Sequence, residues 1–133
     1  MIFGSLLLII LSIPFVIIYL LNNDNPYDKY LVNKYIPLHL EKMGYLEDDI
    51  MKQSYIQPKH GINYDVYQQG HSMVVFKDEP QFEYLYGVTK RGKEVIQFCE
   101  KESLIAENHY GDMNTTKTNH SEKECIGYLD NRD

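Results

Sequence analysis

The sequence lacks charge entirely over its first part. No Asp, Glu, Lys or Arg occurs before Asn22, and residues 2–21 (IFGSLLLIILSIPFVIIYLL) contain 15 Leu, Ile, Val or Phe among 20 positions. A helix of about 20 residues is about 30 Å long, which matches the hydrocarbon core of a bilayer. Each of these apolar side chains favours insertion by about 0.3–0.6 kcal/mol, and spanning helices tolerate a proline such as Pro14. The pattern therefore predicts a transmembrane anchor over residues 1–21, with the membrane as a partner.

A cleaved signal peptide is the alternative for this segment. Such a peptide needs a short apolar run and small residues before the cut, whereas this run is long and continues into residues 20–24 (LLNND) without an A-x-A pattern. The uncleaved anchor is therefore favoured, and we expect residues 2–21 to stay attached in the mature protein. Lys29 and Lys34 follow the span, and only the terminal amine precedes it, a count that favours a cytoplasmic C-terminal domain.

A basic patch is also lacking. The chain has 13 Lys and Arg against 19 Asp and Glu, a net charge of −6, and no run of five or more basic residues. Proteins that bind a phosphate backbone concentrate positive charge on one surface. We therefore expect no nucleic acid among the partners.

Motifs for catalysis and metal binding are missing as well. The five histidines show no HxxxH, HExxH or Cys–His ligand spacing, and the sequence has no CxxC, GxSxG, Walker A or GxGxxG pattern. We therefore predict no catalytic residue, no metal ligand and no cofactor. The two cysteines, Cys99 and Cys125, fit one disulfide outside the cytoplasm or two free thiols inside it.

One helical segment follows the apolar span. In residues 26–44 (PYDKYLVNKYIPLHLEKMG), apolar side chains recur at helical steps of four, four and three. Asn25 is a suitable N-cap before Pro26, and Gly44 is a suitable C-terminal stop. Pro37 is expected to bend or split the helix. The apolar stripe consists of Val32, Ile36, Leu40 and Met43.

Short β-like runs then alternate with turn signals. The runs cover residues 62–67, 72–76, 82–88 and 95–99, with a further strand expected near 53–57. The turn signals are Gln69-Gly70, Asp78-Glu79-Pro80 and Lys90-Arg91-Gly92. These patterns predict an α+β domain over residues 22–99, with one helix packed on a three- to four-stranded antiparallel meander sheet.

The stretch VVFKDEPQFEYLYGV (residues 74–88) has two interpretations. Asp78 and Glu79 are either the polar turn of a β-hairpin or a pair of catalytic or metal-binding carboxylates. The turn is favoured because neighbouring side chains in extended chain point apart and proline restricts the residue before it. The aromatic row Phe82, Tyr84 and Tyr86 is either the inner face of a strand, which is favoured, or an exposed binding surface for a partner.

The C-terminal part loses all periodicity. Residues 100–133 contain 8 acidic and 4 basic residues, so this part carries −4 of the net −6. We expect an acidic, flexible tail, with Ile126, Tyr128 and Leu129 docking weakly on the domain and Cys125 able to fix it covalently.

The order of these features resembles a known family. The relevant motifs follow the apolar span: LEKMGYLEDDI (40–50), VVFKDEP (74–80), YLY (84–86), and a Gly-Lys turn before VIQF (95–98). Over roughly residues 2–99 they resemble the uncharacterised family called domain of unknown function 3139. The resemblance implies a small membrane-anchored protein of Gram-positive bacteria whose domain faces outward, and it supplies no catalytic residues. The helix-plus-meander order is also similar to PepSY-like and cystatin-like domains, which often bind or inhibit.

The expected function is therefore binding rather than catalysis. We expect a single-pass membrane protein whose extracytoplasmic domain binds or regulates a protein or peptide partner at the cell envelope. On this interpretation Cys99 and Cys125 are able to form a disulfide. The alternatives are an accessory subunit of a larger membrane complex, packed through Tyr19 and the face of Ser5 and Ser12, and an envelope hydrolase.

Overall fold

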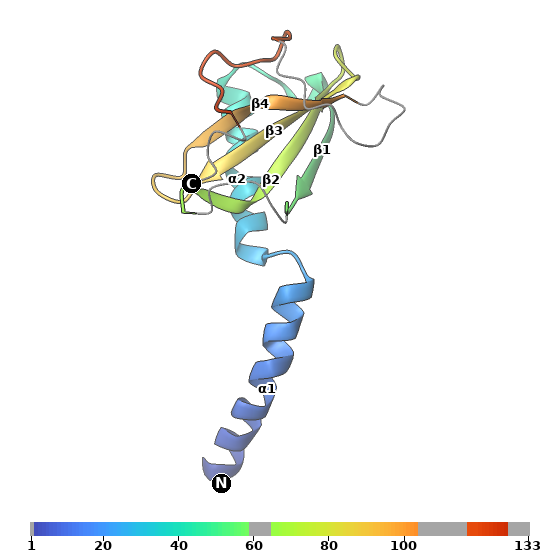
Figure 1. The fold of residues 1–133 in the computed structure, drawn as a ribbon. Helices are drawn as coiled ribbons and strands as arrows, with labels where there is room; N and C mark the ends of the chain where they lie inside the picture. The colour runs from blue at the N-terminus through green and yellow to red at the C-terminus, as the bar shows by residue number, and fades with distance from the viewer. Residues whose placement is uncertain (1, 59–64, 104–116, 128–133) are drawn as a thin grey trace.

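The protein consists of a long N-terminal helix that projects from a small α+β domain (Figure 1). The computed structural model describes residues 2–58, 65–103 and 117–127. The elements in chain order are α1 (Ile2–Asn22), α2 (Pro26–Lys42), the short 3₁₀ helix η1 (Glu47–Asp49), β1 (Ile50–Ile56), β2 (Tyr67–Phe76), β3 (Phe82–Thr89) and β4 (Val95–Ser103).

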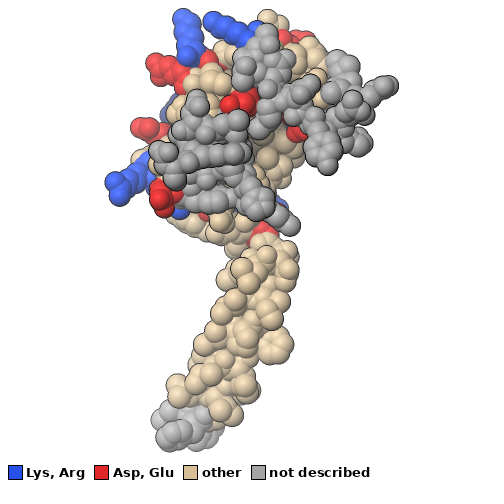
Figure 2. Space-filling view, viewed as in Figure 1, with Lys and Arg blue, Asp and Glu red and all other residues tan. Residues whose placement is uncertain are grey.

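Helix α1 is long enough and apolar enough to cross a membrane. It has 21 residues with Pro14 inside it, and its large apolar side chains from Leu6 to Leu21 are exposed. No charged atom appears along this helix in the space-filling view (Figure 2). An isolated helix with this surface leaves its apolar area unburied, so it needs an apolar environment such as lipid.

Helix α2 begins and ends where the sequence predicts. The side chain of Asn25 accepts a hydrogen bond from the Tyr27 amide at 3.0 Å, and Pro26 occupies the first helical turn. Gly44 has a φ of +94°, the left-handed conformation that favours glycine after a helix. Helix α2 is continuous through Pro37, so the expectation of a split is wrong. Pro37 is exposed, and water can satisfy the carbonyl that loses its amide donor.

The four strands form one antiparallel meander sheet in the order β1-β2-β3-β4. Helix α2 covers one face of this sheet, as the sequence predicts. The core between them is closed by the apolar stripe of α2 and by alternate residues of β2 and β3. The buried members of this core are Val32, Ile36, Leu40, Val74, Phe76, Tyr84, Tyr86 and Val88.

The aromatic row of β3 belongs to this core. Tyr84 is 1% exposed and Tyr86 is 0% exposed, and both pack in the cluster that contains Val32, Ile36 and Leu40. Phe82 is partly buried against the same cluster. The favoured interpretation of this row is therefore confirmed. The alternative, an exposed binding surface formed by all three residues, is wrong because Tyr84 and Tyr86 are at most 1% exposed.

The segment between β2 and β3 is the predicted turn. Lys77–Gln81 joins the two strands, whose register pairs Val74 with Tyr84. Asp78 and Glu79 point to different environments, since Asp78 is exposed and Glu79 is buried. The two carboxylates therefore do not form a shared site.

A second predicted turn, Gln69-Gly70, is instead part of strand β2. A Cβ on Gly70 would overlap the Tyr55 ring, so the ring of Tyr55 lies directly over the Gly70 backbone. Glycine inside a strand often marks such a close approach. The Gln-Gly pair therefore serves packing between β1 and β2 and not a reversal of the chain.

The face of the sheet opposite α2 carries a second apolar cluster. Tyr67, Leu85 and Phe98 are its buried members. His71 lies on the same face, with its ring 5.0 Å from that of Phe98 and no accessible area. Burial lowers the pKa of His71 to about 4, because the low dielectric disfavours the charged imidazolium.

His71 should make the stability of the domain depend on pH. The pKa of an unfolded histidine is about 6.5, so the unfolded state binds more protons than the folded state between about pH 6.5 and pH 4. The free energy of unfolding should keep its full value above about pH 6.5 and fall by roughly 3 kcal/mol as the pH drops to about 4. NMR titration of the His71 imidazole in the full chain tests this, together with unfolding of His71→Phe, which should lose this part of the pH dependence. An imidazole that titrates near pH 6.5 would contradict the expectation.

Candidate functional site

The chain beyond β4 contributes a structured segment at the edge of the sheet. We call residues 117–127 the strap. The amide of Ile126 donates to the Gln97 carbonyl at 3.0 Å, the amide of Cys99 donates to the Ile126 carbonyl at 3.0 Å, and Phe98 and Ile126 form a parallel bridge. The strap thus occupies the outer edge of β4.

This arrangement differs from the predicted tail over residues 100–133. Strand β4 continues to Ser103, so the sheet extends past the expected boundary at residue 99. Ile126 does contact the domain, through backbone pairing. Residues 104–116 and 128–133, which include Tyr128 and Leu129, lie outside the described part of the chain.

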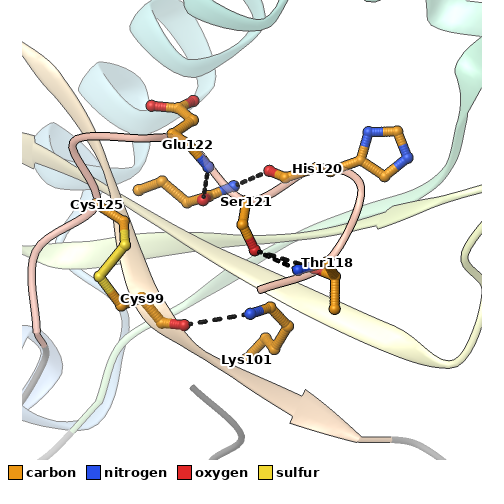
Figure 3. The surroundings of a disulfide bond; sticks show 8 residues. Cys99, Lys101, Thr118, His120, Ser121, Glu122 and Cys125 are labelled. Carbon is orange, nitrogen blue, oxygen red and sulfur yellow. Dashed lines mark hydrogen bonds between the residues drawn. A yellow bond between two sulfur atoms is a disulfide. The ribbon is translucent and has the colours of Figure 1, made fainter. Parts of the chain in front are cut away.

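A disulfide and a buried amide fix the strap (Figure 3). The disulfide joins Cys99 to Cys125, with the two Cα atoms 5.0 Å apart. Gln97 is 2% exposed, and its amide nitrogen donates to the Tyr86 hydroxyl and to the His120 carbonyl, each at 2.8 Å. Its amide oxygen accepts from the amide of Glu122 at 2.8 Å. One side chain of β4 therefore connects the sheet core to two points of the strap.

His120 attaches the strap to the end of the sheet where β2 runs into the β2–β3 turn. Its ring stacks on Phe76, with centroids 3.9 Å apart. Its Nδ1 lies 3.0 Å from the Tyr45 hydroxyl, and its Nε2 lies 2.7 Å from a carboxylate oxygen of Asp78. The hydrogen bond with His120 lowers the pKa of Asp78, because it stabilises the ionised carboxylate.

A second histidine–carboxylate contact attaches the strap to the helix. The Nε2 atom of His39, near the end of α2, lies 2.7 Å from a carboxylate oxygen of Glu122. Both side chains are partly buried. Burial, and then the nearby Glu122 carboxylate, raise the pKa of Tyr45.

Glu79 completes the contacts on the turn between β2 and β3. Its carboxylate accepts hydrogen bonds from the Tyr84 hydroxyl and, at 3.4 Å, from the amide of Asn119. The Tyr84 hydroxyl also contacts the Thr118 hydroxyl. Burial is the main cause that raises the pKa of Tyr84, and the hydrogen bond to Glu79 raises it further. This buried carboxylate therefore has a structural role.

An open groove of about 1030 Å³ lies between α2, the start of β4 and the strap. Leu38, on α2, and Met43, directly after its last residue, are 47% and 50% exposed and line one wall. Charged side chains of both signs surround these apolar groups. They are Lys42 from α2, Lys93 and Glu94 from the β3–β4 turn, and Lys123 and Glu124 from the strap.

The groove combines exposed apolar side chains with charged side chains of both signs. Its two histidines are engaged with carboxylates of the domain itself. Within residues 2–58, 65–103 and 117–127, no group of three or more His, Cys, Asp or Glu is placed to hold a metal ion. An apolar patch with a charged rim is the usual organisation of a protein interface.

The sequence predicted only part of this site. It singled out Cys99 and Cys125, which the structure joins, and the row Phe82, Tyr84 and Tyr86, which lies in the core. It gave no role to Gln97, His120 or Glu122. The one local signal for a docked segment was the apolar cluster at residues 126–129 next to a cysteine.

The fold and the groove define a class of protein: a small α+β domain, closed by a disulfide-linked strap, behind one N-terminal apolar helix. The family model described as "Protein of unknown function (DUF3139)" matches residues 1–86, and the chain belongs to this family. The match ends within β3, so β4 and the strap lie beyond it. No curated protein and no solved structure matches the chain.

Proposed function

We propose that the protein is a single-pass membrane-anchored domain that binds a protein partner outside the cytoplasm, at the envelope of a Gram-positive cell. The groove with Leu38 and Met43 in its wall is the observation that carries this proposal. Exposed apolar groups beside charges of both signs favour a polypeptide with mixed side chains over a small ligand. The binding surface is thus the groove and not the aromatic row of β3.

Two further observations support the location. Helix α1 has the length and apolarity of a spanning helix. The Cys99–Cys125 disulfide is typical of proteins outside the cytoplasm, since the cytosol keeps most thiols reduced. The Lys29 and Lys34 count opposes this orientation, but Asp24 and Asp28 lie beside these lysines and the bias is weak.

Site-specific photo-crosslinking in intact cells tests the proposal. A photoreactive amino acid replaces Leu38, in the groove, or Met51, which is 61% exposed on β1 and serves as the control position. Discrete adducts with a protein are expected from position 38 and not from position 51. Equal adducts from both positions, or adducts from position 51 alone, would contradict the proposal.

A matched pair of methionine substitutions sharpens the same test. Met43→Gln removes an apolar group of the groove, and Met51→Gln makes the same change on β1, away from the groove. Because burying a polar amide in place of an apolar group costs about 1 kcal/mol, Met43→Gln should reduce the adduct from position 38 about fivefold. Met51→Gln should leave the yield unchanged. A yield insensitive to Met43→Gln would argue against the groove as the binding surface.

A further inference from the structure

The turn between β3 and β4 concentrates positive charge in a protein that is acidic as a whole. Lys90, Arg91 and Lys93 occur within four positions of a chain whose net charge is −6. Lys90 and Arg91 are exposed, while Lys93 is partly buried with its Nζ 5.8 Å from the centre of the Tyr27 ring. Of these three residues, only Lys93 lines the groove described above.

Hydrogen bonds hold this turn in one shape. The Thr89 hydroxyl donates to the Arg91 carbonyl at 2.6 Å and accepts from the Glu94 amide at 2.9 Å. The Thr89 amide also donates to the Glu94 carbonyl at 2.9 Å. The side chains of Lys90 and Arg91 are therefore presented from a fixed backbone, which reduces the entropy lost when they bind a charged surface.

The turn lies at the end of the domain where the chain enters from α1. In Figure 1 it is the gold loop at the lower edge of the sheet, and in Figure 2 blue side chains project from that side of the domain. Only residues 23–25 separate α1 from α2. Three extended residues span at most about 10 Å, so the start of α2 and the turn beside Tyr27 stay close to the end of α1 whatever the angle between the helices.

From this position we infer that the Lys90–Lys93 turn docks the domain on the anionic lipid headgroups of the membrane that holds α1. The inference rests on the proposed anchoring by α1. Basic side chains next to a spanning helix are attracted by anionic headgroups, and aromatic side chains favour the interface. Tyr27 and Tyr30, in the first turns of α2, are 56% and 58% exposed and are available at this level.

Acidic groups near the turn restrict the attraction for anionic headgroups to the tip of the turn, where Lys90 and Arg91 lie. Three exposed carboxylates lie near this turn: Asp24 in the α1–α2 link, Asp65 next to Val66, and Glu94 at the base of the turn. The Asp28 carboxylate is instead buried and accepts the Gln69 amide at 3.1 Å. Docking therefore depends on Lys90 and Arg91, which extend beyond the hydrogen-bonded base of the turn. The consequence is a fixed orientation in which the far end of the sheet faces away from the membrane.

A single tryptophan reports this orientation, because the chain has none of its own. Val66→Trp places it beside the turn, where the Val66 carbonyl accepts the Lys90 amide, at a position 43% exposed. Met51→Trp places it near Ile50, which pairs with Phe76 at the opposite end of the sheet. The full chain is reconstituted in vesicles that carry a nitroxide-headgroup lipid as quencher. The vesicles are made of phosphatidylcholine alone or with about one-third phosphatidylglycerol.

Quenching of Val66→Trp should be about twofold stronger in the anionic vesicles, since the headgroups attract the basic turn within a Debye length. Adding Lys90→Glu and Arg91→Glu should remove this difference. Lys77→Glu, on the turn at the far end of the sheet, should preserve it, and Met51→Trp should be quenched little in either lipid. The inference would be overturned if quenching did not depend on lipid charge, or if its dependence remained in the variant with both Lys90→Glu and Arg91→Glu. Flotation separates the two proposals: a chain that does not float with either vesicle would refute anchoring, and the docking with it.

Discussion

Replacing Tyr84 with alanine is expected to lower the free energy of unfolding by about 3–5 kcal/mol, the range for removing a buried aromatic side chain. Tyr84 is 1% exposed and packs in the core between α2 and the sheet. Its hydroxyl also donates to the buried carboxylate of Glu79. The alanine variant therefore loses apolar packing and leaves a buried acceptor without its donor. Chemical denaturation of the full chain in detergent, followed by near-UV circular dichroism, measures the effect.

Two variants separate the causes of this loss. Tyr84→Phe keeps the ring and should cost about 1–3 kcal/mol, the penalty for an unsatisfied buried group. Tyr30→Ala removes a tyrosine that is 58% exposed on α2, and a surface change of this kind should stay within about 0.5 kcal/mol. Equal unfolding free energies for Tyr84→Ala and Tyr30→Ala would mean that Tyr84 is not part of the core.

Breaking the Cys99–Cys125 disulfide is the second change with a large expected effect. The cysteines are 26 positions apart, and closing a loop of about 27 residues stabilises the folded state by roughly 3.5 kcal/mol in the chain-entropy model. The double variant Cys99→Ala with Cys125→Ala should lose about this amount. Reduced wild-type protein should match it, because both lack the same bond.

Hydrogen exchange at individual amides distinguishes the loss of the disulfide from a general loss of stability in the core. Backbone pairing of Ile126 with β4, and the Glu122 contacts, depend on the strap staying in place. Hydrogen exchange of the Ile126 amide should therefore accelerate in the double variant more than exchange in β2, at the centre of the sheet. An oxidised and a reduced protein with the same unfolding midpoint would contradict this role of the disulfide.

The sequence predicted the elements that depend on local signals. The helical spacing of Val32, Ile36 and Leu40 predicts α2, because residues four positions apart in the sequence lie on the same face of a helix. The charged segment before Pro80 predicts the β2–β3 turn for a similar reason. These two predictions define the α+β architecture, because a meander requires only short connections between neighbouring strands.

The sequence predicted contact of the strap only through Ile126 and Cys125, because its other contacts are distant in sequence and mostly polar. His120 contacts Asp78, 42 positions away, and Tyr45, 75 positions away. Glu122 reaches His39 across 83 positions. No periodicity in the sequence indicates such distant pairs. The composition of the segment, polar and acidic, is instead typical of disorder. Gly70 was misinterpreted for a related reason, since the Tyr55 ring above it is visible only in three dimensions.

The proposed function places the domain outside the cytoplasm, with its strap fixed by the Cys99–Cys125 disulfide. Labelling of intact cells with a membrane-impermeant thiol reagent, with and without prior reduction, tests it most directly. The two cysteines are the only ones in the chain, so every labelled site belongs to this pair. Labelling is expected after reduction and not before it. Labelling without reduction would show that the disulfide is absent. Labelling only after lysis, with no need for reductant, would place the domain in the cytoplasm and overturn the proposed location.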